Sequence, residues 1–251
     1  MVLWLIATTL AVPAFADDAF RSFIEMLRPE ARALGVSRAI FDAATQGLEP
    51  DFSLPDLVIP GRPPKPDTQQ PEFIKSPAEY LSEASLNRLA AQARKLAVEH
   101  RATLAAIEQK FGVPSTVLLA IWGRETDFGA YRLPNNAFRV LGTQAYVGRR
   151  KEQFRQEFLL ALKIVADGHA GIADMRSSWA GAMGLTQFLP SEFYKYAVDF
   201  DGDGRRDIWS SVPDALASAA KQLVEKGWQA GKGWAYEVRV PRDVDCTRAD
   251  P

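Results

Sequence analysis

The spacing of hydrophobic residues along the chain of 251 residues predicts a mainly helical protein. Apolar side chains recur every three or four positions in several segments, and glycine or proline separates most of these segments. The longest such segment lies at 81–111, and Gly112 and Pro114 separate it from the next. The predicted helices are two short ones within 18–48, one at 81–111, one that starts at Pro114 and ends before Gly129, and others at 151–166, 191–198 and 211–227.

Two stretches break the helical pattern. Eight of the sixteen prolines fall between Pro50 and Pro77, which excludes a regular helix or a central strand there. This stretch also holds apolar residues such as Phe52 and Leu54, so we predict an extended segment that wraps on the domain surface. The alternation at 234–240 predicts a strand.

The first residues carry the features of an export signal. An apolar run at 2–12 precedes Ala14-Phe15-Ala16, which predicts a signal peptide at 1–16 and cleavage before Asp17. The alternative is a buried N-terminal helix. No cysteine follows the run, so we expect a soluble periplasmic protein without a lipid anchor. The predicted organisation is a signal peptide at 1–16, a helical segment at 17–48, a proline-rich segment at 49–80, a main domain at 81–240 and a tail at 241–251.

Composition narrows the function classes. The chain is 47% hydrophobic and 24% charged, as expected of a globular protein, and its net charge of −1 gives no reason to expect nucleic-acid binding. The one cysteine, Cys246, excludes an intramolecular disulfide and a thiolate metal cluster. The two histidines, His100 and His169, lie far apart and are expected to be structural. We expect a monomer.

The segment from Ile121 to Gly129 contains the strongest candidate for catalysis. Glu125 follows Ile121 by four residues and Trp122 by three, which predicts that it shares their inward helix face. Burial disfavours the charged carboxylate, so such a glutamate holds its proton near neutral pH and can act as a general acid. The alternative is a surface glutamate paired with Arg124.

Two further segments carry polar groups in distinctive settings. In the stretch from Ser177 to Pro190, small residues permit close backbone approach, and Gln187 can bind an amide or a sugar hydroxyl. A tight helix contact that needs only glycine and alanine is the alternative. Arg149 and Arg150 precede a helix and can clamp a carboxylate, or they form an ordinary solvated charge run.

The segment 199–210 resembles a calcium loop. Asp199, Asp201 and Asp203 stand at loop positions one, three and five, and Gly204 stands at position six, where the chain must turn. Ser210 stands at position twelve, where a bidentate glutamate is expected, so we consider Asp207 or Asp214 as the source of the missing oxygen. The alternative is a solvated acidic turn. The predicted ligands of Ca²⁺ are Asp199, Asp201, Asp203, the backbone carbonyl of Arg205, Asp207 and Ser210.

Taken together, these segments resemble the membrane-bound lytic murein transglycosylase B family over residues 20–240. The resemblance rests on Trp-Gly-x-Glu-Thr-x-Phe-Gly around Glu125, on Arg149-Arg150, on the Ser178 to Pro190 stretch and on the acidic loop. It implies a mainly α, lysozyme-like fold with a small β portion and a peptidoglycan substrate with peptide stems. Two departures are Gln222, which stands where an aromatic site residue would align, and an end soon after 240, where relatives continue.

Carried over position by position, the resemblance implies a role for each candidate residue. Glu125 would be the single catalytic acid/base, and Ca²⁺ in the acidic loop would be structural, with no cofactor for the chemistry. The residues expected to contact substrate are Ser178 and Gln187 at the sugar, Arg149 and Arg150 at the peptide stem, and Phe188.

A single carboxylate limits the mechanism. Most glycosidases use two carboxylates, but Asp127 lies two residues from Glu125 and therefore points to another helix face. We therefore expect the substrate acetamido group to assist Glu125, and the product to carry a 1,6-anhydro ring. The alternatives are a hydrolytic muramidase and a non-catalytic peptidoglycan-binding protein.

Overall fold

The computed structural model describes residues 14–61, 76–233, 235 and 238–239. Helices dominate this part of the chain, and the one named sheet within it has two short antiparallel strands, with Asn135 opposite Ser177. The elements are α1 (Ala14–Met26), α2 (Arg28–Ala33), α3 (Arg38–Thr45), α4 (Pro77–Tyr80), α5 (Glu83–Glu99), α6 (Arg101–Phe111), α7 (Ser115–Thr126), β1 (Asn135–Asn136), α8 (Ala137–Val147), α9 (Lys151–Ala166), the 3₁₀ helix η2 (Ile172–Asp174), β2 (Arg176–Ser177), α10 (Pro190–Tyr196) and α11 (Val212–Glu225).

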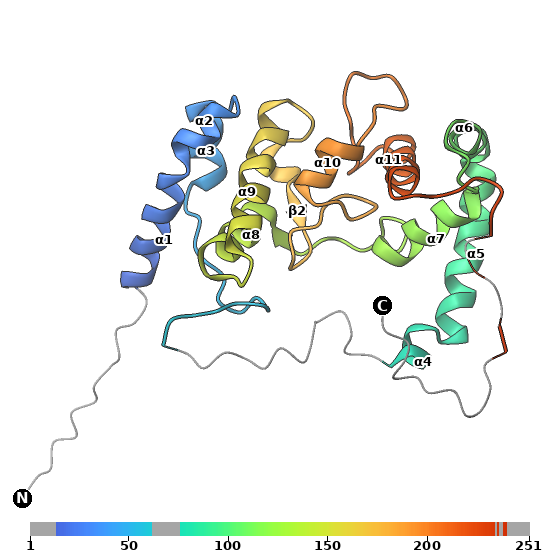
Figure 1. Ribbon diagram of the computed structural model, residues 1–251, viewed down its shortest axis with the longest axis horizontal. Helices are drawn as coiled ribbons and strands as arrows, with labels where there is room; N and C mark the ends of the chain where they lie inside the picture. The colour runs from blue at the N-terminus through green and yellow to red at the C-terminus, as the bar shows by residue number, and fades with distance from the viewer. Residues whose placement is uncertain (1–13, 62–75, 234, 236–237, 240–251) are drawn as a thin grey trace, which may run out of the picture.

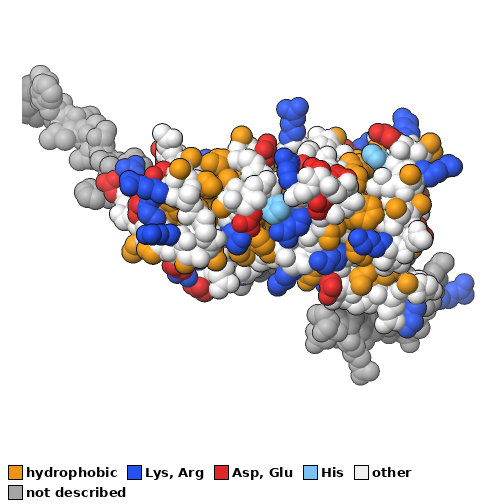
Figure 2. Space-filling view, turned by 90° about the horizontal axis from the view of Figure 1, so that it is seen from above, with side chains coloured by type: hydrophobic (Ala, Val, Ile, Leu, Met, Phe, Trp, Pro, Cys, Tyr) orange, Lys and Arg blue, Asp and Glu red, His pale blue; other side chains and the backbone are white. Residues whose placement is uncertain are grey.

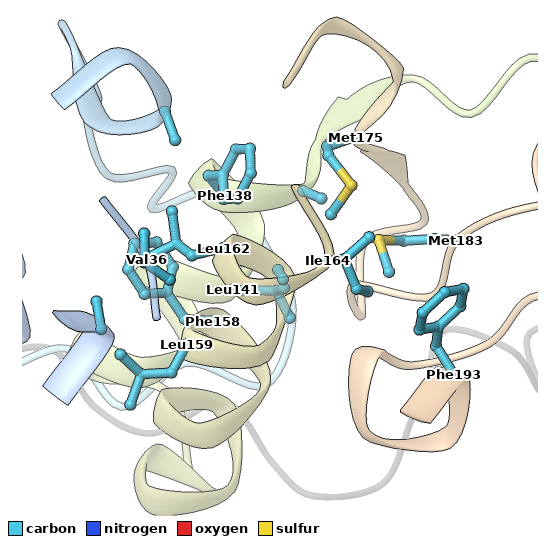
Figure 3. Packing of buried hydrophobic residues seen from close by; sticks show 14 of the residues in the cluster. Val36, Phe138, Leu141, Phe158, Leu159, Leu162, Ile164, Met175, Met183 and Phe193 are labelled. Carbon is cyan, nitrogen blue, oxygen red and sulfur yellow. The ribbon is translucent and has the colours of Figure 1, made fainter. Parts of the chain in front are cut away.

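Two hydrophobic clusters hold the helices together. The larger cluster joins α1–α3 to α8, α9 and α10, and Figure 3 shows Phe138 and Phe158 on one side of it and Met183 and Phe193 on the other. The smaller cluster joins α5, α6, α7 and α11 around Trp122. The two groups of helices occupy opposite ends of the molecule in Figure 1. Leu185 packs against both clusters, so the loop that carries it lies at their junction.

Most predicted helices are present. Helix α9 has the predicted bounds, Gly112 adopts the left-handed conformation that ends α6, and the Ser211 hydroxyl caps α11 by accepting the Asp214 N–H. The single helix predicted at 81–111 is wrong in one respect, because the chain bends at His100 and forms α5 and α6. The bend lets α6 pack on α11 while α5 packs on α7.

The sequence pattern did not predict α8. This helix buries residues all round its circumference, so it has no polar face to give a helical period. Fully buried helices lack the alternation on which sequence interpretation depends. Its buried residues are Ala137, Phe138, Val140, Leu141, Gly142, Thr143, Gln144, Ala145 and Val147.

Residues 50–61 of the proline-rich segment run along α8 without regular secondary structure. Leu54 is buried, the Gln144 side-chain amide donates to the Pro55 carbonyl at 3.0 Å, and the Val58 N–H donates to the Val147 carbonyl at 2.6 Å. Backbone groups of the segment therefore bond to the end of α8 at several points. Residues 62–75 lie outside the described residues.

The predicted strand at 234–240 is not found where it can be checked. Ala235, Val238 and Arg239 are outside any strand, and the other four positions lie outside the described residues. The small β portion of the fold is instead the β1–β2 pair.

The signal-peptide prediction falls almost wholly on residues 1–13, which also lie outside the described part. Among the described helices, none alone has the length and apolar composition needed to cross a membrane. The bent pair α6 and α7 meets that test only when the two are taken together.

Candidate active site

Glu125 lies in the last turn of α7 and is exposed, which corrects the prediction of an inward side chain. Leu118, two turns earlier on the same line of the helix surface, is fully buried. The segments of the chain that cover this face of α7 therefore end before its last turn. Asp127 and Phe128 then adopt left-handed backbone conformations, which end the helix and turn the chain away.

The Glu125 carboxylate has no hydrogen-bond or ion-pair partner among the described residues. Burial raises its pKa above the ordinary value of 4.5, and the positive charge of Arg124 opposes this rise. Water reaches the side chain, yet the neighbouring protein displaces enough solvent to disfavour the charge. An unpaired carboxylate with a raised pKa at an open position is suited to donate a proton.

Two backbone contacts of Leu185 connect the end of α7 to the rest of the molecule. The Thr126 hydroxyl donates to the Leu185 carbonyl at 2.8 Å, and the Leu185 N–H donates to the Ile208 carbonyl at 2.8 Å. The first bond places the loop that carries Gln187 beside the helix turn that carries Glu125. The second bond joins that same loop to the acidic loop.

The loop at 178–188 is stabilised by its own side chains. The Ser178 hydroxyl oxygen accepts the N–H groups of Ala180 and Ala182, at 3.3 and 3.2 Å. Gln187 is a non-glycine residue with φ of 57°, and its amide donates to the Gly184 carbonyl at 3.0 Å. Such strained conformations persist only where the surrounding structure enforces them, and they concentrate at functional sites.

Glycine in this loop also serves close packing, which was the alternative interpretation of the segment. Gly181 has φ of +85°, and a Cβ atom there would collide with the side chain of Leu141. The packing of Gly181 on Leu141 therefore supports the close-packing interpretation, and the role of Gln187 in binding stays a prediction.

Phe188 does not line an open site, which corrects its predicted role in substrate binding. Its side chain is 1% exposed and lies in the larger hydrophobic cluster. Its ring packs edge-on against Tyr196, and its backbone exchanges two hydrogen bonds with Met183 at 2.9 Å. A ring covered in this way stabilises the loop and does not reach a ligand.

The paired arginines lie just beyond α8 and contact the proline-rich segment. The Arg149 Nε atom is 3.1 Å from one carboxylate oxygen of Asp56, and an Arg150 terminal nitrogen is 3.4 Å from the other. The Arg150 guanidinium also lies over the Phe154 ring. The sequence pattern gave no indication of Asp56 as their partner, because it lies more than ninety positions earlier in the chain.

The acidic loop places three carboxylates at one point. One oxygen from each of Asp199, Asp201 and Asp203 lies within 4.8 Å of the others, and all three side chains are exposed. The N–H groups of Gly202 and Gly204 bond to Asp199 and hold the loop in a tight turn. Converging carboxylate oxygens at this spacing are the donors that Ca²⁺ prefers, so the residues present fit the ion.

Asp207 does not belong to that cluster, and its carboxylate accepts the Ser210 hydroxyl, so the prediction of both residues as ligands does not fit this arrangement. Asp207 accepts the Trp209 and Ser210 N–H groups at 2.9 Å, and it also accepts the Ser210 hydroxyl and the Arg205 guanidinium. Burial alone would raise the pKa of Asp207, but these hydrogen bonds bring it below the ordinary value. The buried Asp214 carboxylate also accepts hydrogen bonds, from the N–H groups of Phe200, Asp201 and Asp207.

A cavity of about 670 Å³ opens beside Thr126, on the side that the acidic loop borders. Arg132, Arg176, His169 and Trp209 line it, and Glu125 does not. The sequence pattern gave no signal for this cavity, because its lining comes from four separated segments. Figure 1 shows the acidic loop rising between α10 and α11, and Figure 2 looks down on that face, where acidic and basic side chains intermingle.

Comparison with known proteins identifies the family. The family described as "Transglycosylase SLT domain" matches residues 19–251. The chain belongs to this family. It is 36% identical over 124 residues to the membrane-bound lytic murein transglycosylase B of Escherichia coli, a match that covers 49% of this chain and 34% of that protein.

Solved structures share the mainly helical, lysozyme-like fold. SltB3 of Pseudomonas aeruginosa, in complex with NAG-NAM-pentapeptide, is 36% identical with a TM-score of 0.75, and the match covers 92% of this chain and 59% of SltB3. A second SltB3 structure contains NAG-anhNAM-pentapeptide, with a TM-score of 0.74 and the same identity and coverage. The calcium complex of E. coli Slt35 is 28% identical with a TM-score of 0.55, over 62% of this chain and 48% of Slt35. The chain thus spans about a third of its curated relative and three fifths of SltB3.

Proposed function

We propose that the protein is a lytic transglycosylase that cleaves the bond between N-acetylmuramic acid and N-acetylglucosamine in peptidoglycan. Family membership and the ligands named for SltB3 support this substrate class. The observation that carries the proposal is Glu125, a carboxylate with a raised pKa and no partner among the described residues, beside the loop of Gln187.

The proposed mechanism uses Glu125 twice. The protonated carboxyl gives its proton to the glycosidic oxygen, the bond from that oxygen to the muramyl C1 breaks, and the acetamido oxygen of the same sugar stabilises the positive charge at C1. The resulting carboxylate then takes the proton from the muramyl C6 hydroxyl, and the C6 oxygen bonds to C1. Glu125 regains its proton, the product carries a 1,6-anhydro ring, and no water enters.

Ser178 and Gln187 would orient the acetamido group. Both belong to the loop that Thr126 holds against α7, and neither side chain is fully buried. Each keeps hydrogen-bonding capacity beyond the bonds it makes within the loop. A preorganised polar loop lowers the barrier because its groups need not reorganise during the reaction.

Glu125→Gln tests the catalytic assignment. It preserves size but cannot donate the proton, so we expect cleavage of purified peptidoglycan to fall by ~100- to 10,000-fold while the glycan still binds. Asp127→Asn is the matched control, because Asp127 is the neighbouring carboxylate and its partner is Arg88, at 2.8 Å. We expect this control to cleave like the wild type. Near-normal cleavage by Glu125→Gln would exclude the proposed mechanism.

Mass analysis of the wild-type products completes the experiment. Anhydro ends, one water lighter than reducing ends, support the transglycosylase. Reducing ends would identify a hydrolytic muramidase with the same acid. Binding without any cleavage by the wild type would indicate a peptidoglycan-binding protein.

We also propose that the acidic loop holds a structural calcium ion. Asp199, Asp201 and Asp203 would ligate it, with the carbonyl of Arg205 as a further predicted ligand, and the ion would neutralise the repulsion between three exposed carboxylates. The calcium complex of Slt35 supports this assignment.

Calcium titration into chelator-treated protein tests the ion site. A ligand that binds only the folded state at 100 times its dissociation constant stabilises it by about 2.7 kcal/mol, so we expect a clear rise in melting temperature. Asp203→Asn should weaken the response, whereas Asp174→Asn, an exposed aspartate outside the loop, should not. An unchanged melting temperature in the wild type would contradict the assignment.

The proposed cellular location is the bacterial periplasm, where peptidoglycan lies. The apolar run at 2–12 and the Ala14-Phe15-Ala16 sequence support export. The peptide stems of the glycan are the proposed partners of Arg149 and Arg150.

A further inference from the structure

The cavity beside Thr126 has no part in the proposed mechanism. Its volume of about 670 Å³ lies within the range of small-molecule sites. Thr126 stands in the last turn of α7, and its hydroxyl donates to the carbonyl of Leu185, which also lines the cavity. The cavity therefore borders the helix turn that carries Glu125, although Glu125 itself does not line it.

The charged side chains that line the cavity make it cationic. Three arginines and two aspartates line it, which leaves one net positive charge. Asp207, one of the two aspartates, pairs with Arg205 at 3.0 Å, so this pair is neutral. His169 adds no charge near neutral pH, because burial and the neighbouring Arg206 lower its pKa below the ordinary value of 6.5. The three carboxylates of the acidic loop do not line the cavity.

The other two arginines of the lining have no carboxylate partner among the described residues. Arg132 makes no hydrogen bond or ion pair there. Arg176 donates only to the backbone carbonyls of Leu133, at 3.3 Å, and Pro134. These bonds hold the Arg176 side chain beside the residue that follows Arg132, and they use two of its five N–H donors. Arg132 and Arg176 therefore share one part of the wall, and both have N–H groups available for an anion.

Apolar side chains form another part of the wall. Ala170, Ala173, Leu185 and Trp209 line the cavity. The half-buried Trp209 ring packs against Phe193, with 5.6 Å between the ring centroids, and this contact limits its movement. Guanidinium groups bind carboxylates through paired N–H bonds, and apolar walls favour short apolar side chains. A peptide with a free carboxylate combines both features.

We propose that this cavity binds a carboxylate of a peptidoglycan peptide stem, with Arg132 and Arg176 as the groups that contact it. The inference rests on the proposed function, which supplies a substrate with such stems. A glycan strand carries many stems, so a stem in this cavity is compatible with the predicted contact of another stem with Arg149 and Arg150. The bound peptide would lie against Thr126 and Leu185, beside the last turn of α7.

Titration of the protein with the isolated pentapeptide stem tests the site. The readout is the indole N–H resonance of Trp209 in isotope-labelled protein, and Trp209→Phe identifies this resonance by removing it. We expect the peptide to shift the resonance in a saturable way. The same peptide with its carboxylates converted to amides should bind about tenfold more weakly, because it cannot form the charged hydrogen bonds to arginine.

Arg132→Gln tests the contribution of the unpaired arginine. We expect it to weaken peptide binding by about tenfold, and its melting temperature should stay at the wild-type value because Arg132 bonds to no other described residue. Arg38→Gln is the matched control, since Arg38 is exposed on α3, contacts Asp42 at 3.4 Å and does not line the cavity. Arg150→Gln should also leave the Trp209 shift unchanged, which separates this site from the predicted contact at the paired arginines.

The outcomes separate the possibilities. Equal binding of the free and the amidated peptide, an unchanged affinity in Arg132→Gln, or a Trp209 resonance that does not move would overturn the inference. Acetate that binds as tightly as the peptide would indicate a site for any small carboxylate and would overturn the assignment to a stem. The comparison of the two peptides uses only the wild type, so it decides the question even if Arg132→Gln does not fold.

A parallel assay of peptidoglycan cleavage distinguishes this inference from the proposed function. Cleavage by a wild type that binds no peptide in the cavity would overturn this inference alone. Binding in the cavity without any cleavage would refute the proposed function and leave the peptide site in place.

Discussion

Glu125 and Asp207 are carboxylates in two connected regions, with opposite environments. Asp207 accepts N–H groups, a hydroxyl and a guanidinium, and its pKa falls below the ordinary value. Glu125 accepts nothing from the described residues, and its pKa rises. Leu185 connects the two regions, because its carbonyl accepts the Thr126 hydroxyl and its N–H donates to the Ile208 carbonyl.

The comparison shows how the same chemical group serves structure in one place and chemistry in another. Hydrogen bonds to the charged form stabilise a carboxylate and commit it to holding a loop together. A carboxylate left without donors is destabilised in its charged form and remains available to give a proton.

The largest expected effect is on stability, and it comes from removing a hydrogen-bonded carboxylate in the region of Asp207. Asp214 is fully buried and accepts three backbone N–H groups, from Phe200, Asp201 and Asp207. Asp214→Ala leaves these donors without an acceptor, so we expect the free energy of unfolding to fall by about 3 kcal/mol or more. Urea unfolding followed by circular dichroism measures it. Asp203→Asn, at an exposed position of the same loop, is the control, and an equal loss there would contradict the burial argument.

A smaller effect tests the comparison directly. It is a pH-dependent change in melting temperature, with opposite signs for substitutions of Glu125 and Asp207. Because the folded pKa of Glu125 is raised, its neutral form stabilises the fold below the unfolded pKa, and this contribution is lost as pH rises through the folded value. Glu125→Gln keeps the neutral form, so it should melt slightly above the wild type at about pH 7 and equal it at about pH 4.

Asp207→Asn should show the reverse. The folded pKa of Asp207 is lowered, so its contribution is present above the unfolded pKa and is lost as pH falls through the folded value. Its variant should therefore melt below the wild type at about pH 7, and the difference should shrink in acid. Melting curves of both variants at the two pH values measure the contrast, and shifts of the same sign would refute it.

Sequence patterns among neighbouring residues were sufficient to predict much of the fold. The amphipathic repeat of α9, the Gly112 stop, the Ser211 cap and the spacing of the three aspartates depend on residues close in sequence. Helix α8 was missed because burial on all sides removes its periodicity. The break between α5 and α6 was missed because packing on α11, and no glycine or proline, determines it.

The sequence by itself determined the family resemblance, most helices, the identity of Glu125 as the candidate acid and the acidic loop. Only the tertiary structure decided which side chains are covered, because burial depends on segments far apart in the chain. It exposed Glu125, buried Phe188, bonded the Ser210 hydroxyl to Asp207 and placed Asp56 between two arginines. Spacing along a helix or loop fixes the direction of a side chain, but only the neighbouring segments determine what that side chain meets.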